Sequence, residues 1–189
     1  MLTMSKPSRS VGVMWVFIQS RIIIQRVGIY LGLGSNLGDR EANLRNVLSA
    51  LRNREVNPRQ SAALYSTEPR DFEDQPWFLN TVVEVRTGLD PDALMHACLA
   101  IEADAGRERT TPKGPRVIDI DILLYEAFVL TTSGLKIPHP RFRERRFVLV
   151  PLAELAPDFI DPVSHQTMRQ LLKVCPDAGV VQRYAGPLL

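Results

Sequence analysis

Hydrophobic and polar positions along this chain of 189 residues recur with two different periods. Apolar residues at every second position predict a strand, and apolar residues every three to four positions predict a helix. From residue 27 to residue 125 the predicted elements are, in order, a strand at 27–33, a helix from Asp39 to 51, a strand at 59–66, a strand at 78–87, a helix from Asp90-Pro91 to Gly106 and a strand at 116–125. This βαββαβ order predicts an α+β protein with a ferredoxin-like core, in which an antiparallel sheet carries helices on one face.

Two segments flank this core. Beyond it, apolar spacing predicts additional C-terminal helices near 146–155 and 167–174, which should pack as an extra layer. Before it, residues 1–26 combine several basic residues and serines with no acidic residue and with a short apolar run at 11–18. That composition has some transit-peptide character, but the run could equally be an added strand or upstream sequence from an early start codon. We expect an extension of uncertain role at 1–26 and a single domain at 27–189.

Composition excludes several classes of protein. The formal net charge of +2, from 23 basic and 21 acidic residues, is too balanced for a general nucleic-acid-binding surface. Cys98 and Cys175 are isolated, without the spacing of a zinc site or of a disulfide framework, which favours a reducing, cytoplasmic setting. No window approaches the roughly 18 apolar residues of a membrane span. We therefore expect a cytoplasmic monomer that binds neither nucleic acid nor a membrane.

The strand at 116–125 carries the most informative pair of residues. Asp119 and Asp121 interrupt an otherwise apolar run, and residues two apart leave a strand on the same face. Two adjacent carboxylates must share a proton or a cation, and paired oxygen ligands suit a hard ion such as Mg²⁺ that also binds phosphates. The pair therefore suggests metal-assisted phosphate chemistry. A structural salt bridge with Arg116 is the alternative.

The turn that follows the first strand, Gly32-Leu-Gly-Ser-Asn-Leu-Gly38, was compared with dinucleotide-binding loops. The third glycine of that motif would stand at position 37, which is Leu37, so the motif fails. We interpret Gly32 and Gly34 as positions of close backbone approach, or as parts of a tight turn.

Other candidate ligands surround the aspartates in the sequence. Guanidinium groups suit a triphosphate, although loop arginines are often simply solvated. The basic residues are Arg107, Arg109, Lys113, Arg116, Arg141, Arg143, Arg145 and Arg146. On the strand at 78–87, Phe78 and Asn80 share a face and could present an aromatic surface and an amide to a flat heterocycle, or could form part of the core.

Four segments together resemble the 6-hydroxymethyl-7,8-dihydropterin pyrophosphokinase family, from Val27 to about Cys175. They are Leu33-Gly-Ser-Asn-Leu37, Asp74-Gln-Pro-Trp-Phe-Leu-Asn80, the segment 114–124 with its two aspartates, and Ile137-Pro-His139 followed by Arg145-Arg-Phe147. The resemblance implies transfer of pyrophosphate from ATP to the pterin alcohol, with AMP as the leaving group, in folate biosynthesis. ATP would be the co-substrate and two Mg²⁺ ions the cofactors.

Roles for individual residues follow from that resemblance. It places metal ligands at Asp119 and Asp121, and catalytic charge stabilisation at Arg107 and Arg116. Nucleotide contacts fall on Glu102, Arg107, Arg109, Arg116, Ile122, His139 and Arg145, and pterin contacts on Thr67, Phe78, Asn80 and Phe147. Two departures from the family pattern are Lys113, where a tryptophan is frequent, and Glu68, where a proline is frequent; both concern loop closure. No side chain stands out as a general base.

Two other classes of protein share the predicted fold. An RNA-binding domain would explain the sheet and the arginines, but the segment 141–150 lacks the glycine and stacking aromatics of an RNP1 motif. A regulatory ligand-binding module would have no need for a paired-carboxylate metal site.

Overall fold

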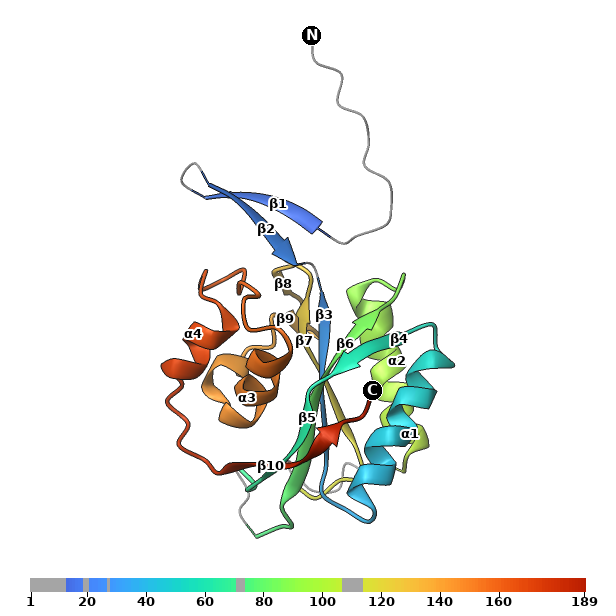
Figure 1. Cartoon of the computed structure of the whole chain (residues 1–189). Helices are drawn as coiled ribbons and strands as arrows, with labels where there is room; N and C mark the ends of the chain where they lie inside the picture. The colour runs from blue at the N-terminus through green and yellow to red at the C-terminus, as the bar shows by residue number, and fades with distance from the viewer. Residues whose placement is uncertain (1–12, 19–20, 27, 71–73, 107–113) are drawn as a thin grey trace.

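The computed structural model describes residues 13–18, 21–26, 28–70, 74–106 and 114–189, with side chains from Gly28 onward (Figure 1). Its main sheet is antiparallel and has the strand order β10-β5-β6-β3-β7, with β4 also paired to β6. The strands are β3 (Ile29–Ser35), β4 (Asn57–Ser61), β5 (Ala63–Thr67), β6 (Phe78–Arg86), β7 (Asp119–Tyr125) and β10 (Val181–Pro187). Two small sheets pair β1 (Val13–Ile18) with β2 (Arg21–Arg26) and β8 (Leu130–Thr131) with β9 (Lys136–Ile137).

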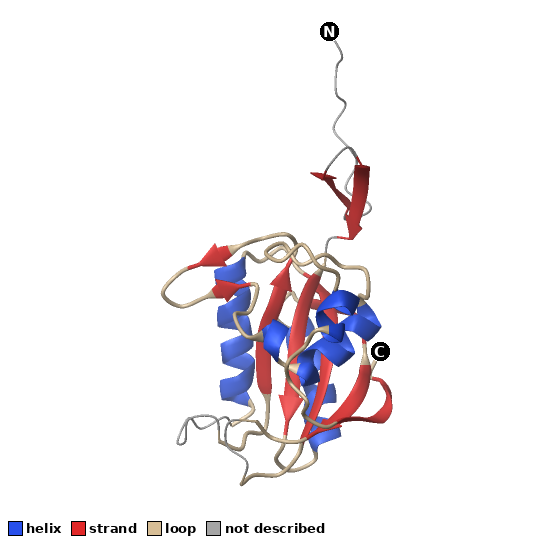
Figure 2. Ribbon diagram, turned by 90° about the vertical axis from the view of Figure 1, so that its left-hand side faces the viewer, coloured by secondary structure: helices blue, strands red, loops and turns tan. Residues whose placement is uncertain are grey.

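Helices cover both faces of the sheet (Figures 1 and 2). Helices α1 (Arg40–Arg52) and α2 (Pro91–Asp104) lie on one face. Helices α3 (Arg146–Leu155) and α4 (Met168–Lys173), preceded by the short 3₁₀ helix η1 (Phe142–Glu144), lie on the other. Each pair buries its own apolar cluster against the sheet, Leu44 and Leu94 belonging to the first cluster and Leu149 and Leu152 to the second. None of the helices in the described ranges is long and apolar enough to cross a membrane.

Local signals in the sequence explain where the two core helices begin and end. Asp39 caps α1 by accepting a hydrogen bond from the amide of Ala42 (3.0 Å), and Asp90 caps α2 through the amide of Ala93 (2.8 Å). Pro91 occupies the first turn of α2, where its missing N–H costs nothing. Gly106 follows α2 at a φ of +79°, a conformation that a glycine adopts without strain. These predicted helix boundaries are confirmed.

The predicted antiparallel α+β architecture and the extra layer of C-terminal helices are likewise confirmed, and the elements from β3 to β7 follow the predicted βαββαβ order when β4 and β5 are counted as one strand. The more specific ferredoxin-like assignment stays a prediction. The predicted strand at 59–66 was wrong in detail, because it is two strands separated at Ala62. The pairing with β6 moves by one residue between Ser61↔Val83 and Tyr65↔Asn80, so a continuous ladder cannot form there. Strand β10 was not predicted.

The sheet itself places Asp119 and Asp121 on the face that α3 covers. Their neighbours Ile118, Ile120 and Ile122 belong to the apolar cluster under α1 and α2. Side chains alternate along a strand, so the two aspartates point away from that cluster. An apolar strand thereby presents two carboxylates to the space beside α3.

Candidate active site

A pocket on this second face collects side chains from distant parts of the chain. Its lining residues are Thr67, Glu68, Arg70, Gln75, Phe78, Asn80, Arg116, Asp119, Asp121, Arg145 and Phe147. A smaller adjoining pocket shares Asn80, Asp119, Asp121 and Phe147 and reaches the backbone of Gly32 and Gly34. The two aspartates, the predicted pterin contacts and two of the predicted arginines therefore lie around one space.

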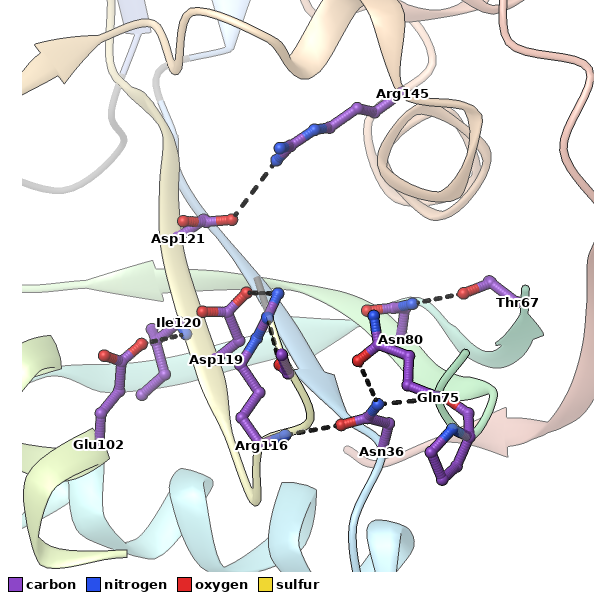
Figure 3. A network of polar contacts seen from close by, with 12 residues as sticks. Asn36, Thr67, Gln75, Asn80, Glu102, Arg116, Asp119, Ile120, Asp121 and Arg145 are labelled. Carbon is purple, nitrogen blue, oxygen red and sulfur yellow. Dashed lines mark hydrogen bonds and ion pairs between the residues drawn. The ribbon is translucent and has the colours of Figure 1, made fainter. Parts of the chain in front are cut away.

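One end of the pocket is charged, and we call Asp119, Asp121, Arg116 and Arg145 the carboxylate end. Arg116 Nη2 donates to Asp119 Oδ2 at 2.9 Å, so the salt bridge considered from the sequence is present (Figure 3). Asp121 Oδ2 lies 3.9 Å from Arg145 Nη1, a looser ion pair. The salt bridge with Arg116 thus accounts for one aspartate of the pair.

A nearby cation would stabilise the ionised form of Asp121. Desolvation by the surrounding protein, followed by the charge of Asp119, raises the pKa of Asp121 to about 6, although Arg145 and Arg116 act in the opposite direction. Its side chain nevertheless keeps an exposed fraction of 37%. An ion that enters the pocket can therefore reach it.

A divalent cation fits this pair, but only with further ligands. Among the residues that the structure describes, no group of three or more His, Cys, Asp or Glu side chains could hold a metal ion. A hard ion at Asp119 and Asp121 would complete its coordination with waters and substrate phosphates, which is the usual way in which Mg²⁺ is bound. The two aspartates could therefore hold Mg²⁺ together with a bound phosphate substrate.

The other end of the pocket is neutral, and we call Thr67, Phe78, Asn80 and Phe147 the amide end. Asn80 Nδ2 donates to Thr67 Oγ1 at 2.7 Å, and both residues are buried (Figure 3). Asn80 stands opposite Gly34 in the β3–β6 ladder, and a Cβ atom at position 34 would lie only 2.6 Å from Asn80 Oδ1. The amide is held from both sides.

Arginines of the carboxylate end stack on aromatic rings of the amide end. The guanidinium carbon of Arg116 lies 5.1 Å from the ring centroid of Phe78, and that of Arg145 lies 5.6 Å from the ring centroid of Phe147. Both distances are within the range of cation–π attraction. The two ends of the pocket are consequently in direct contact.

Asn36, in the turn after β3, holds three loops together at the base of the pocket. Its Nδ2 donates to Gln75 Oε1 (3.0 Å) and to the carbonyl of Pro76 (3.1 Å), and its Oδ1 accepts from the amide of Arg116 (2.8 Å) (Figure 3). Asn36 itself is 2% exposed. The sequence motifs contained Asn36 and Gln75 but gave them no role. The feature that could have indicated a role for Asn36 is a polar residue directly after a buried strand.

Three of the predicted nucleotide contacts do not line the pocket. Glu102, on α2, is buried on the opposite side of β7, where Oε1 accepts from the amide of Ile120 at 2.8 Å (Figure 3). The side chain of Ile122 lies in the core. His139 accepts a hydrogen bond at Nδ1 from the amide of Arg141 (3.2 Å), and burial, together with Arg145 and Arg141, lowers its pKa to about 4. Arg107, Arg109 and Lys113 lie outside the described residues.

Besides Gln75, two lining residues were not singled out from the sequence as ligands. Glu68 was noted only as a departure from the family pattern, and Arg70 was not noted at all. Both lie in the segment that follows β5. Nothing in the local sequence distinguishes them from ordinary loop charges.

Comparison with known proteins assigns this chain to a family. Residues 30–157 match the family model described as 7,8-dihydro-6-hydroxymethylpterin-pyrophosphokinase. The chain is 44% identical over 152 residues to the 2-amino-4-hydroxy-6-hydroxymethyldihydropteridine pyrophosphokinase of Methylorubrum extorquens, covering 80% of this chain and 95% of that protein. It is 43% identical over 152 residues to the folic acid synthesis protein fol1 of Schizosaccharomyces pombe, again over 80% of this chain but only 21% of that longer protein.

Solved structures agree at the level of the fold. The crystal structure of wild-type Plasmodium falciparum HPPK-DHPS superposes with a TM-score of 0.59 at 16% identity, covering 78% of this chain and 44% of that one. A crystal structure of HPPK-DHPS in complex with substrates gives a TM-score of 0.61 at 15% identity, covering 78% and 43%. Family model, sequence relatives and fold point the same way, and the chain belongs to the 7,8-dihydro-6-hydroxymethylpterin-pyrophosphokinase family.

Proposed function

We propose that this pocket is where the chain transfers a pyrophosphoryl group from ATP to 6-hydroxymethyl-7,8-dihydropterin, the reaction of folate synthesis that its family performs. One observation carries the assignment of the reaction to this place. A carboxylate pair with two arginines lies directly beside a neutral surface built from Phe78, Asn80 and Thr67. A phosphate donor and a flat heterocycle can therefore be bound next to each other.

At the carboxylate end, Asp119 and Asp121 would hold two Mg²⁺ ions, which would screen the triphosphate and polarise its phosphorus atoms. The protein would contribute fixed positive charge around them. Arg116 and Arg145 already lie in the pocket, and their planar guanidinium groups can each donate two hydrogen bonds to phosphate oxygens. Arg107 and Arg109 would add to this charge, as the resemblance implied.

His139 is suited to a neutral hydrogen bond rather than to a charge. Its lowered pKa keeps the imidazole uncharged near pH 7, and because Nδ1 accepts from Arg141, the ring proton is on Nε2. An Nε2–H group donates to a phosphate oxygen without adding charge. Glu102 and Ile122 stay predicted nucleotide contacts, Ile122 through its backbone.

At the amide end, the pterin ring would lie against Phe78 and Phe147, with Asn80 and Thr67 hydrogen-bonded to its edge. Asn80 suits this task because an amide both donates and accepts, as a pterin edge does. Stacking there requires space that Arg116 and Arg145 partly cover. When those arginines turn toward phosphate oxygens, the ring faces become available.

The chemical step would be in-line attack of the pterin hydroxymethyl oxygen on the β-phosphorus of ATP, with AMP leaving. Acceleration would come from positioning and from neutralisation of charge on the transferred group. We further propose that the enzyme is a monomer of the cytoplasm, a reducing compartment that the isolated Cys98 and Cys175 favour. Sedimentation at micromolar concentration tests the monomer.

Product analysis tests the reaction. The purified chain is mixed with ATP, Mg²⁺ and the reduced pterin, quenched early and separated by chromatography. Attack at the β-phosphorus predicts that AMP appears one-for-one with pterin diphosphate. Stoichiometric ADP with a pterin monophosphate would overturn the proposal, as would the absence of any pterin product.

A further inference from the structure

Asp177 lies outside the segment 30–157 that matches the family model. It also lies beyond Cys175, where the family resemblance found in the sequence ends. Its side chain is 5% exposed, yet it stands between α4 and β10 in a segment without regular structure. Both carboxylate oxygens are used. Oδ1 accepts from Arg70 Nη2 (2.8 Å) and from the amide of Gly179 (2.8 Å), and Oδ2 accepts from the amide of Arg146 (2.9 Å).

Two of the three partners of Asp177, Arg70 and Arg146, belong to different segments of the pocket wall. Arg70 lines the pocket, together with Thr67 and Glu68 of the same segment. Arg146 is the first residue of α3, and its neighbours Arg145 and Phe147 also line the pocket. The N-cap residue Arg145 makes no side-chain capping hydrogen bond to α3, and the carboxylate of Asp177 accepts from one of the amides in the first turn instead.

Gly179 lets the backbone pass close to the charged groups of Asp177, Arg70 and Glu68. A Cβ atom at position 179 would lie 2.9 Å from Asp177 Oδ1, 3.1 Å from Arg70 Nη1 and 3.1 Å from Glu68 Oε1. Arg70 Nη1 in turn donates to Glu68 Oε1 at 3.3 Å. A side chain at position 179 would therefore displace the charged groups of this ion-pair cluster.

From these contacts we infer that Asp177 is a positioning residue for the pterin substrate, joining the Thr67–Arg70 wall of the pocket to the Phe147 wall. This inference rests on the proposed pterin site at the amide end. A single buried carboxylate sets the separation of the two walls between which the heterocycle binds. Asp177 acts through Arg70 and Arg146 and touches no substrate.

Replacing Asp177 with asparagine tests the role of the carboxylate without changing the size of the side chain. Asp177→Asn preserves the size of the side chain but leaves only one acceptor oxygen. Whichever way the amide turns, its NH₂ group faces a donor, either Arg146 N–H or Arg70 and Gly179 N–H. One wall therefore loses its connection to the carboxylate.

The structure offers a matched control in Asp161. This carboxylate is also buried, pairs bidentately with Arg143 (2.7 and 2.6 Å) and accepts from backbone amides, but neither Asp161 nor Arg143 lines the pocket. Asp161→Asn removes the same chemical group from an equally buried ion pair. Loss of stability alone should affect both variants alike.

The experiment measures kcat and the two KM values of the full-length enzyme and its variants, at a temperature where each is folded by circular dichroism. Asp177→Asn is expected to raise KM for the pterin about tenfold, with kcat and KM for ATP changing less than about threefold. Arg70→Gln, which breaks only the loop side, is expected to raise the pterin KM by a smaller factor. The double variant should resemble Asp177→Asn, because both changes remove the same connection. Asp161→Asn should lower the melting temperature and leave the pterin KM unchanged.

The outcomes separate this inference from the proposed reaction. An inactive wild-type enzyme would reject the proposed function itself. An active wild type, together with an unchanged pterin KM in Asp177→Asn or an equal rise in Asp161→Asn, would reject Asp177 as a positioning residue. If Asp177→Asn does not fold, Arg70→Gln decides, since Arg70 is 44% exposed and its replacement should leave the fold intact; an unchanged pterin KM in that variant would then reject the inference.

Discussion

The carboxylate end and the amide end of the pocket are built in opposite ways. At the amide end, Asn80 is hydrogen-bonded to Thr67 and packed against the backbone of Gly34, so its polar atoms are fixed before any ligand arrives. At the carboxylate end, two like charges stand side by side, and the pKa of Asp121 is raised because burial and Asp119 disfavour its ionised form. The amide at one end is held in place by contacts within the protein, whereas the carboxylate end is completed by what binds there.

That difference suggests that the two ends of the pocket have separate tasks. A preorganised amide can discriminate between heterocycles, because a wrong partner leaves buried polar atoms unpaired. A pair of adjacent carboxylates lowers the stability of the fold, but it attracts cations. When cations bind the carboxylates, the arginines paired with them can bind phosphates instead. Functional sites of this kind commonly lower the free energy of unfolding of the protein.

The largest expected effect follows removal of charge at the carboxylate end. Asp119→Asn and Asp121→Asn should each reduce kcat by about a thousandfold or more, since each deletes a proposed metal ligand. Steady-state kinetics at saturating ATP and Mg²⁺ measures this. Asp158→Asn, in an exposed ion pair with Arg169, is the control and should behave as wild type. Near-native turnover in either active-site variant would remove that residue from the metal site.

A smaller effect is expected from crowding the amide. Gly34→Ala places a Cβ atom against Asn80 Oδ1 and should raise KM for the pterin by about tenfold. Gly32→Ala is the matched change two residues earlier in β3, where the nearest atoms are 3.4 Å away on the side chain of Leu123, and should alter the pterin KM less than about threefold. Equal effects of the two alanines would indicate that strand β3, rather than Asn80, is responsible.

The stability of the metal-free protein should reveal the strain at Asp121. Its folded pKa lies near 6, above the ordinary value of 3.8, so the stability it contributes is present below pH 3.8 and is lost as the pH rises through 6. Asp121→Asn lacks this loss and should be more stable than wild type at pH 8, by about 1 kcal/mol after allowance for solvent screening. Urea unfolding in EDTA at pH 8 and pH 4.5 measures the difference. An advantage that is equal at both pH values would exclude ionisation as its cause.

The smallest expected effect concerns the N-terminal extension. Strands β1 and β2 pair with each other, and the pocket residues that the structure describes all lie at or after Gly32. We propose that the domain begins at residue 27, so that a chain lacking residues 1–26 keeps kcat and both KM values within about twofold. A folded truncated protein with turnover reduced more than tenfold would place the domain boundary earlier.

Much of the site could be predicted because its residues have local signatures. Asp119 and Asp121 stand out as charges in a buried strand, and Asp39 and Asp90 precede helices at capping positions. The salt bridge to Arg116, only three residues from Asp119, was also accessible from the sequence. Local patterns of this kind predicted that the two carboxylates lie side by side. They left undecided whether the partner of the pair is Arg116 or a metal ion.

What could not be predicted depends on contacts between distant parts of the chain. Strand β10 pairs with β5 at the edge of the sheet, and its mostly exposed residues show no alternation that would predict a strand. Asp177 meets Arg70 only because β10 returns beside β5. The bulge at Ala62 likewise depends on the register with β6, which no single segment specifies.

Separate binding measurements test the division between the two ends most directly. Calorimetry is performed with a non-hydrolysable ATP analogue and Mg²⁺, and then with the pterin on protein saturated with that analogue. Asn80→Ala should weaken pterin binding by about 2 kcal/mol, roughly 30-fold, and leave the nucleotide affinity within about threefold. Asp119→Asn should do the reverse, weakening the Mg²⁺-dependent nucleotide affinity while saturated protein still binds the pterin. If each variant weakens both ligands equally, the pocket does not have two ends with separate tasks.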